Sequence, residues 1–440
     1  MSPETLLEDL VHGDTAAKLR AADLLGQLAE RKAVGRLTAC LRDGDPKLRA
    51  VVCEALGRIG DPRAVPPLVS MLRDPEEDVR GEAFSALFAI GESRAGKLPI
   101  EALEGEDPGN PSLALTQIVW PADLEAIKML HDALADGDPE VRIGAAYTLG
   151  RLGIMGAFPQ IAALLRGDPD PDVRAAAAFA LGDLGLSGDR RVVPELINAW
   201  YTVGAEDELA VLVVRALADI GATDAAPILQ AALRHRDDRV RQLAAMGLGR
   251  TGDPAAVDAL AGALRDPHAG VRRIAANALA VTRSPRAIAP LIHATVGDSS
   301  EVRSACGAAL ARLDRTAVHA ALQDALAEQD PELRAAATYL MGRIGDAQGL
   351  GRALVDPHEG VRKAAAIAMG NIAAPGFRAP LERALGDPAW PVRVAAAEGL
   401  RRLGDPAALP ALERHHDDPH PVVRNAVAVA TKTLTAGAPR

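Results

Sequence analysis

Apolar residues recur at helical spacing along the chain, in short segments that each begin with an aspartate. Residues 60–91, GDPRAVPPLVSMLRDPEEDVRGEAFSALFAIG, are typical. One apolar face in this segment consists of Ala64, Val65, Leu68, Met71 and Leu72, and a second consists of Val79, Ala83, Leu87 and Ile90. Asp61-Pro62 and Asp74-Pro75 mark the two helix starts, because aspartate caps free N–H groups and proline in the first position loses no hydrogen bond. The pattern predicts two short amphipathic helices, which bury their faces only by stacking on similar pairs.

The same segment recurs along the whole sequence. Its second helix starts with Val-Arg or Leu-Arg, and these arginines are Arg49, Arg80, Arg142, Arg174, Arg241, Arg272, Arg303, Arg334, Arg362, Arg393 and Arg424. From Arg241 to Arg334 they stand 31 residues apart, three times in succession. A fixed period of this length indicates stacked supersecondary units. We therefore expect an all-α fold in which residues 1–440 form a single elongated solenoid of about fourteen two-helix repeats.

Two segments depart from the repeat. In residues 92–122 the arginine position is Ala114, and in residues 186–221 it is Ala210. The aromatic residues in these segments are Trp120, Trp200 and Tyr201. Such departures mark either a functional site or a bend whose gaps the rings fill, and the sequence leaves both open. Residues 421–440 are a candidate C-terminal cap, and it is equally open whether they close the stack or leave an apolar edge.

Composition favours closely packed helices and excludes some functions. Apolar residues make up 48% of the chain and aromatic residues 2%, so the core is expected to consist of Ala, Leu, Val and Ile. The net charge of −10 disfavours a protein whose whole surface attracts nucleic acid or anionic membranes. No basic, apolar leader opens the sequence and no apolar run is long enough to span a membrane, so we expect a cytoplasmic protein without a membrane partner. Cys40, Cys53 and Cys306 lack paired spacing and are expected to be small core residues.

An acidic residue stands six positions before most of the repeated arginines. We expect these acids to cap the second helices and to bind an arginine of the same or the adjacent repeat, which would form a ladder of structural ion pairs along the stack. The expected members are Asp43, Arg49, Asp74, Arg80, Asp136, Arg142, Asp168, Arg174, Asp266, Arg272, Asp356, Arg362, Asp387, Arg393, Asp418 and Arg424. His235 and Gly297 replace the acid before Arg241 and Arg303, so the ladder should be interrupted there.

The repeated pattern, DPxVRxxAAxALGxIGDP, resembles the HEAT-repeat family, and in particular the short bacterial type named after phycobilisome lyases. The resemblance covers nearly the whole chain. It implies a right-handed superhelix whose first helices lie outside and whose second helices line a concave face. We expect the recurring glycines to close helices.

The concave face is the expected binding surface. Counting from the Val or Leu before the arginine as position 0, positions 0, 4, 8 and 11 form the buried stripe, and positions 2, 6 and 10 face solvent and vary between repeats. Tyrosine and arginine, frequent at binding hot spots, recur at these positions. The expected partner-binding residues are Tyr147, Arg151, Phe179, Arg215, Met246, Arg250, Arg273, Tyr339, Arg343, Lys363 and Arg402. The alternative is that the aromatic side chains only complete packing between second helices.

Two histidine-containing stretches are candidate metal sites. His358-Glu359 follows a helix start, and the HEAT-like enzyme deoxyhypusine hydroxylase binds iron through several such pairs. This chain has one pair, and Ala269 stands where the sister stretch would repeat the acid. The stretch RHHDDPH, residues 414–420, contains an ordinary inter-helix turn. We expect neither a metal nor a cofactor, and no catalytic residues.

Three functions compete. The favoured one is a non-enzymatic scaffold whose concave face binds another protein through an acidic or amphipathic segment. The resemblance to phycobilin lyases implies a second, in which the chain helps to attach or isomerise a bilin on a partner protein, although no residue group suited to that chemistry is present. The third is nucleic-acid binding, as in HEAT-like DNA glycosylases, through the position-10 arginines. Scarce lysine and the negative net charge disfavour it.

Overall fold

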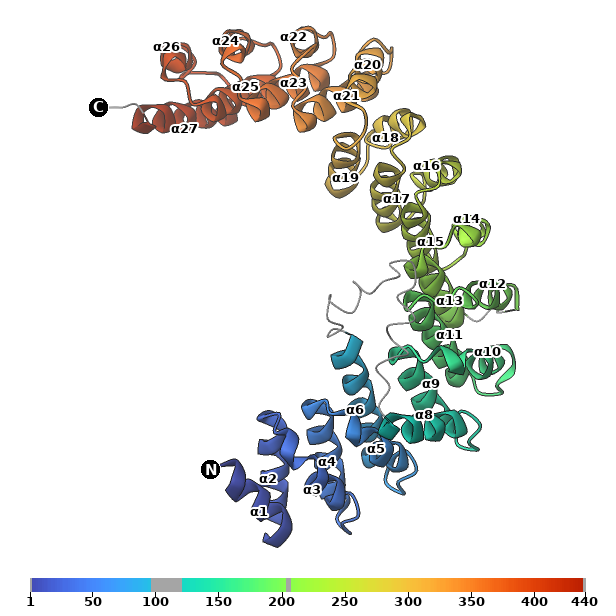
Figure 1. Cartoon of the computed structure of the whole chain (residues 1–440). Coiled ribbons are helices and arrows are strands. Elements are labelled where there is room, and N and C mark those ends of the chain that lie inside the picture. Colours follow the sequence, from blue (N-terminus) through green and yellow to red (C-terminus); the bar gives the residue numbers. More distant parts are fainter. Residues whose placement is uncertain (1, 96–120, 203–206, 438–440) are drawn as a thin grey trace, which may run out of the picture. The chain divides into compact units, whose positions relative to one another are not determined.

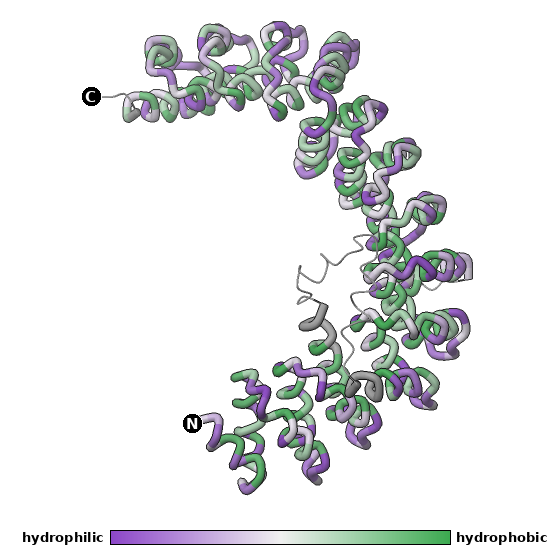
Figure 2. The backbone as a smooth tube through the Cα atoms, viewed as in Figure 1, coloured by the Kyte–Doolittle hydropathy of each residue, from purple (hydrophilic) through white to green (hydrophobic). Residues whose placement is uncertain are grey.

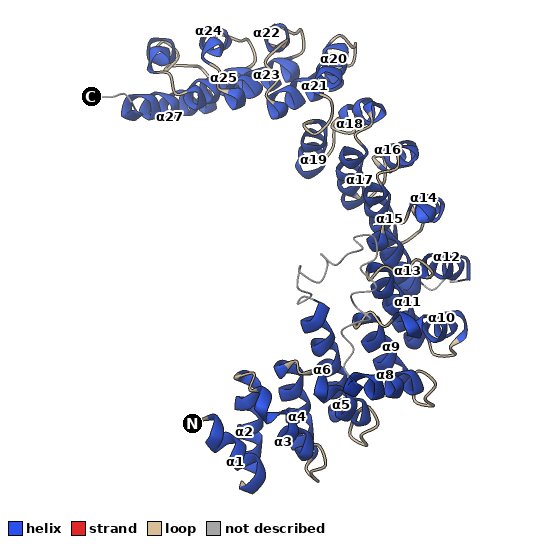
Figure 3. Ribbon diagram, in the orientation of Figure 1, coloured by secondary structure: helices blue, strands red, loops and turns tan. Residues whose placement is uncertain are grey.

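A computed structural model describes residues 2–95, 121–202 and 207–437 of the chain. Within these ranges every regular element is a helix and no strand is present (Figure 3). The helices pack as consecutive pairs, and the chain divides into two compact units, Met1–Leu229 (unit 1) and Gln230–Arg440 (unit 2). The expected all-α solenoid is confirmed.

Unit 1 contains six helix pairs within its described residues. Their first helices are α1 (Pro3–His12), α3 (Val34–Cys40), α5 (Val65–Met71), α8 (Pro121–Ala133), α10 (Phe158–Gly167) and α12 (Val192–Thr202). Their second helices are α2 (Thr15–Gln27), α4 (Pro46–Ile59), α6 (Glu77–Ala95), α9 (Pro139–Arg151), α11 (Pro171–Leu186) and α13 (Asp207–Ile220). Second helices of successive pairs pack on one another and form one row, beside which the first helices form another (Figure 1).

Unit 2 continues the same arrangement. Its first helices are α14 (Ala226–Ala232), which crosses the boundary, α16 (Val257–Ala263), α18 (Ile288–His293), α20 (Arg315–Leu326), α22 (Leu350–Ala353), α24 (Arg378–Ala384) and α26 (Leu409–Glu413). Its second helices are α15 (Asp238–Thr251), α17 (Ala269–Thr282), α19 (Ser300–Leu310), α21 (Pro331–Ile344), α23 (Glu359–Ile372), α25 (Trp390–Leu403) and α27 (Pro421–Gly437). Hydrophobic and hydrophilic residues alternate along the helices of both units (Figure 2), as amphipathic helices require.

Most first helices begin with a 3-10 turn. In the typical repeat Asp61 accepts a hydrogen bond from the N–H of Arg63 at 3.0 Å, Pro62–Ala64 forms the turn, and the α-helix follows. The sequence therefore located this start correctly. Ala64, the last residue of the turn, is fully buried. The α20 pair lacks this turn, because Arg315 replaces the proline and the α-helix begins at once.

The glycine that recurs near the end of many second helices has a different role from the expected one. A Cβ atom added to Gly57 would lie 2.7 Å from the Cα atom of Ala86, and one added to Gly150 would lie 2.6 Å from Cα of Ala180. These glycines allow neighbouring second helices to approach each other closely. Helices are closed instead by a later glycine at positive φ, such as Gly60, whose N–H bonds to the carbonyl of Leu56.

The two irregular segments differ in the structure. Most of residues 92–122, including Ala114 and Trp120, lies outside the described residues, and the pairs on either side contact each other directly, with α5 packed on α8 and α6 on α9. Residues 186–221 include an ordinary pair, α12 and α13, in which buried Ala210 fills the arginine position. On α12, Trp200 is half-buried and Tyr201 is 72% exposed.

In the candidate cap α27, Val427 is buried, whereas Val422 and Val429 are exposed. All three cysteines are buried, as expected, and burial raises the pKa of Cys53 and of Cys306 to about 12. Within the described ranges no helix is long and apolar enough to cross a membrane.

Candidate functional site

The second-helix face is the surface that positions 2, 6 and 10 of the second helices form. In α15, Val240, Ala244 and Leu248 occupy positions 0, 4 and 8 and are fully buried. Position 6 of the same helix, Met246, is half-buried and position 10, Arg250, is exposed. The predicted division of each second helix into a buried stripe and an open face therefore holds, although the degree of exposure differs between the two units.

In unit 1, aromatic side chains on this face pack on one another. The Tyr147 ring lies between those of Phe84 and Phe179, at centroid distances of 5.6 and 5.0 Å. Edge-to-face and tilted geometries of this kind are favourable. Burial raises the pKa of the Tyr147 hydroxyl. For Tyr147 and Phe179 the packing alternative describes the structure better than two freely exposed binding side chains.

The charged residues of the unit 1 face are largely paired with each other. Arg58 donates to Asp23 at 2.8 Å and to Glu54 at 2.6 Å. Arg151 lies 3.7 Å from Asp183, whose carboxyl pKa is raised by burial and lowered, to a smaller extent, by the same arginine. Arginine and carboxylate at neighbouring repeats thus neutralise each other. Arg215, also predicted here, is exposed on α13.

In unit 2 the same face is open and basic. Its exposed cations at positions 2 and 10 are Arg250, Arg273, Arg312, Arg343, Lys363 and Arg402. No described residue forms an ion pair with Arg273, Arg312 or Lys363. Arg343 donates to the hydroxyl of Ser304 at 3.2 Å. Of the binding residues expected in this unit, Arg273 and Lys363 are therefore exposed cations without an ion-pair partner among the described residues.

The tyrosine of the unit 2 face also contacts another side chain. Tyr339 is half-buried, and the guanidinium carbon of Arg303 lies 5.4 Å from its ring centroid. This distance permits a cation–π interaction. Tyr339 and Tyr147 both occupy position 6 of their helices. Tyr339 has an arginine as its neighbour, whereas Tyr147 has two phenylalanines.

Charge composition divides at the same boundary. Residues 1–229 contain 37 acidic and 22 basic residues, whereas residues 230–440 contain 22 acidic and 27 basic ones. The net charges are −15 and +5. The whole-chain value of −10 conceals this division, which the sequence contains but which becomes visible only once the boundary is known.

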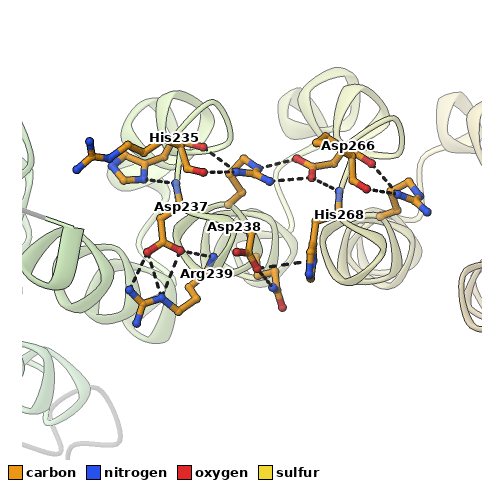
Figure 4. Close-up of polar contacts among 11 residues, drawn as sticks. His235, Asp237, Asp238, Arg239, Asp266 and His268 are labelled. Carbon is orange, nitrogen blue, oxygen red and sulfur yellow. Dashed lines mark hydrogen bonds and ion pairs between the residues drawn. The ribbon is translucent and has the colours of Figure 1, made fainter. Parts of the chain in front are cut away.

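The Asp–Arg ladder consists of arginines that bind the aspartate of the next repeat. Arg241 donates through Nε and Nη2 to the two carboxylate oxygens of Asp266, at 2.7 and 3.0 Å (Figure 4). Its Nη1 donates to the carbonyl oxygens of His235 and Arg236, both at 2.9 Å. Asp266 also accepts the N–H of His268 at 2.8 Å. Arg241 thereby links the turn that precedes its own helix to the aspartate of the following repeat.

Most expected members of the ladder occupy these positions. The two-pronged pairs are Arg49–Asp74, Arg142–Asp168, Arg241–Asp266, Arg272–Asp298, Arg334–Asp356, Arg362–Asp387 and Arg393–Asp418. Arg174 and Arg424 donate to the carbonyls of Asp168 and Asp418 in the same way. The aspartates precede the helices and hold turns through the N–H two residues later, so the expectation that they are the N-caps themselves was wrong. The cap of α9, for example, is Asp138.

Several details of the ladder differ from expectation. Asp298, one residue beyond Gly297, binds Arg272, so no interruption occurs there. Arg80 binds Glu140, while Asp136 binds Arg73 at 2.8 Å. The sequence interpretation also missed a first member, because Lys18 replaces the arginine and donates to Asp43 at 3.1 Å. The sequence feature that could have identified Lys18 is the N-capping Asp14, four residues before it.

At His235 the imidazole imitates the missing aspartate. Its Nδ1 accepts the N–H of Asp237 at 3.1 Å, which preserves the turn before α15 (Figure 4). A histidine has no carboxylate to bind the arginine of the preceding repeat, and that repeat has Ala210 in place of the arginine. The sequence correctly located this change.

The histidines considered for metal binding have local roles. His358 caps α23 by accepting the N–H of Gly360 at 3.2 Å. His415 and His416 bond to carbonyl oxygens of their own helix end, and the ring of His420 stacks on Trp390 at 4.1 Å. Among the described residues no group of three or more His, Cys, Asp or Glu side chains is placed to hold a metal ion.

Comparison with known proteins agrees with this architecture. The family model for HEAT repeats matches residues 3–87, 97–182, 158–245, 203–280, 228–311 and 347–432. The chain therefore belongs to the HEAT-repeat family. No curated protein matches the chain.

Solved structures share the fold at low sequence identity. A chain from the structure described as "Kap95p Binding Induces the Switch Loops of RanGDP to adopt the GTP-bound Conformation" is 14% identical with a TM-score of 0.53, over 99% of this chain and 67% of that one. A chain from "A conserved phosphorylation switch controls the interaction between cadherin and beta-catenin in vitro and in vivo" is 15% identical with a TM-score of 0.39, over all of both chains. At such identities only the α-solenoid architecture is shared.

Proposed function

We propose that this protein is a non-enzymatic scaffold that binds another protein through the second-helix face. The observation that carries the proposal is the row of exposed cations in unit 2, three of which have no ion-pair partner among the described residues. A solenoid repeats one structural unit and leaves the surface positions of each repeat free to vary, which suits extended contact with a partner. The similar structure that concerns Kap95p and RanGDP provides support by analogy.

The proposed partner contact is an acidic or amphipathic segment. Arginine and lysine on the face attract carboxylates, while exposed Ile367 and half-buried Met246 provide apolar area beside them. The ladder aspartates and arginines bind each other and are assigned a structural role. No residue is proposed to be catalytic.

Obstructing the face without changing its charge tests this proposal. Asn277 and Ala308 are exposed at position 6 of α17 and α19, and Asn277→Trp with Ala308→Trp would place two bulky rings on the surface. The matched control places the same rings on the first helices of the same unit, as Gly262→Trp with Ala289→Trp, where both positions are also exposed. Proteins captured from a native cell extract are identified by mass spectrometry for the three forms, after equal helicity is established.

The expected result is a protein that the unmodified chain and the control capture and the face variant does not. Identical captures by all three forms would contradict the proposal and direct attention to the first helices. A bilin or a nucleic acid in the eluate would support one of the two alternative functions instead.

A further inference from the structure

Six successive repeats of unit 2 each contribute one exposed cation to the face. Five of the cations are on second helices, with Arg250 on α15, Arg273 on α17, Arg343 on α21, Lys363 on α23 and Arg402 on α25, and Arg312 follows the end of α19. At positions 2, 6 and 10 of these helices the only acidic residue is Glu398, which lies 3.2 Å from Arg401 and 3.9 Å from Arg402. Over six repeats the face therefore has six cations and a single carboxylate at these positions.

The corresponding positions of unit 1 have the opposite character. They include four acids, Asp23, Glu54, Asp183 and Asp219, and two of their three arginines bind these acids. An acidic ligand that approaches unit 1 meets four half-buried carboxylates, and Arg215 is the one arginine of the three for which no ion pair with them is observed. Like charges brought together at an interface disfavour binding strongly.

We infer that the partner segment is acidic, carries aliphatic side chains and binds the second-helix face of unit 2 alone. This inference rests on the proposed scaffold function and names its site and its ligand. Neighbouring packed helices lie about 8–10 Å apart, so five steps from α15 to α25 correspond to about 40–50 Å. An extended chain advances about 3.3–3.6 Å per residue, so a segment of about 15 residues reaches all six cations.

The composition of the face favours a protein ligand over a nucleic acid. Position 6 holds the apolar residues Met246, Ala308 and Ile367, and the cations lie beside them at positions 2 and 10. Aliphatic side chains of a peptide can pack on these apolar residues, whereas a phosphate backbone cannot. Base stacking requires open aromatic rings. Tyr339 is the only aromatic residue at these positions of α15–α25, and its ring already interacts with Arg303.

A binding titration with a defined probe tests the inference. The probe is a fluorescein-labelled 15-residue peptide of Glu, Asp, Leu and Ala, and its neutral counterpart contains Gln and Asn at the acidic positions. Fluorescence anisotropy is measured with the full-length protein at low salt. We expect binding of the acidic peptide that weakens as salt is raised, because the contacts are exposed ion pairs.

Two variants of equal charge locate the site. Arg273→Gln, Arg312→Gln and Lys363→Gln remove three cations of the face, all exposed and without ion-pair partners among the described residues. Arg265→Gln, Arg352→Gln and Arg383→Gln remove three exposed cations from the first-helix side of the same unit. The first variant should bind the acidic peptide at least about tenfold more weakly, and the second within about twofold of the unmodified protein.

Three results would overturn the inference. They are equal weakening by both variants, equal binding of the neutral peptide, and tighter binding of a 15-base-pair DNA duplex that the face variant abolishes. The scaffold proposal is judged separately, because the tryptophan variants obstruct the face for a partner of any charge. Loss of capture by those variants together with no binding of the acidic peptide would retain the scaffold and reject the acidic ligand.

Discussion

Units 1 and 2 are built on the same mechanical plan and present opposite surfaces. Both bury positions 0, 4 and 8 of their second helices, both pair arginine with an aspartate of the next repeat, and both use glycine where second helices touch. The units differ at positions 2, 6 and 10, where unit 1 has packed aromatic rings and paired charges and unit 2 has open cations. The residues that hold the stack together are thus separate from those that vary, so one fold can carry two surfaces.

The largest difference in stability is expected between Arg142, which forms a two-pronged ion pair, and Arg303, which forms no ion pair among the described residues and contacts the Tyr339 ring. Arg142 and its partner Asp168 have side chains only 11% and 5% exposed. Removing one member of a buried pair leaves an uncompensated charge, so Arg142→Gln should lower the free energy of opening around α9 and α11 by about 2–4 kcal/mol. Arg303→Gln loses only a contact with Tyr339 and should cost about 1 kcal/mol or less around α19 and α21.

Hydrogen exchange followed by mass spectrometry measures both values in the full chain, because a solenoid opens locally as well as globally. Arg142→Lys is the control, since it retains the charge and loses the two-pronged geometry, and it should fall between the unmodified protein and Arg142→Gln. Equal losses from Arg142→Gln and Arg303→Gln would show that the ion pairs contribute little beyond packing.

The sequence predicted the architecture because the repeat itself specifies it. The period, the Asp-Pro starts and the recurring arginines give the helix pairs and the Asp–Arg ladder. Periodicity cannot tell which carboxylate an arginine reaches. Asp298, one residue beyond Gly297, binds Arg272, because a shift of one residue within a turn moves a flexible side chain little. Arg80 binds Glu140, and Arg73 of the same repeat binds Asp136.

The candidate site was less predictable, because exposure at a position depends on the neighbouring helix. Tyr147 and Tyr339 both occupy position 6, and no local sequence pattern distinguishes them. Tyr147 is covered by Phe84, which lies 63 residues earlier and is adjacent only because α6 packs directly on α9. The glycine of the Leu-Gly pair was misinterpreted for a similar reason, since its contact is with another repeat.

A second comparison uses these two tyrosines. Tyr147→Ala should lower the free energy of opening in unit 1 by about 2–3 kcal/mol, because it leaves a gap between two phenylalanine rings. Tyr339→Ala should cost about 1 kcal/mol in unit 2, where the ring has one cationic neighbour. Hydrogen exchange again provides the measurement. Tyr147→Phe retains the packing and should change stability little, and a loss equal to that of Tyr147→Ala would mean that the hydroxyl, not the ring, is the stabilising group.

The close-approach glycines should respond alike in both units. Gly150→Ala in unit 1 and Gly249→Ala in unit 2 would each bring a methyl group within 3 Å of an alanine on the next helix. Overpacking costs about 1–3 kcal/mol, and the higher helix propensity of alanine returns up to about 1 kcal/mol, so we expect a net loss of about 1 kcal/mol. Gly262→Ala is the control, because nothing lies within 4 Å of its added methyl group, and it should be neutral or stabilising. A loss confined to one unit would mean that the two stacks are not packed in the same way.

The smallest expected effect is a difference between the two units in the stability that each loses in acid. Hydrogen bonds from Arg49, Arg334 and Arg393 lower the pKa values of Asp74, Asp356 and Asp418, respectively, against the opposing effect of burial. An unfolded aspartate has a pKa of about 3.9, so the ionised carboxylates stabilise the fold fully above that pH and lose this contribution as pH falls through the lower folded values. Among the described residues, unit 2 has five two-pronged pairs and unit 1 has two. Unit 2 should therefore lose more stability below pH 4.

Tryptophan fluorescence can separate the two units, because Trp390 is the sole tryptophan of residues 230–440. The Trp120→Phe, Trp200→Phe protein reports on unit 2, and the Trp390→Phe protein reports on unit 1. In an acid titration from pH 4.5 downwards, the signal from unit 2 should change at the higher pH. Adding Asp418→Asn to the unit 2 reporter removes one titrating member of the Asp–Arg ladder, so it should lower stability at neutral pH and reduce the further loss in acid. Coincident acid transitions in the two reporters, unmoved by Asp418→Asn, would mean that groups outside the ladder govern acid unfolding in both units.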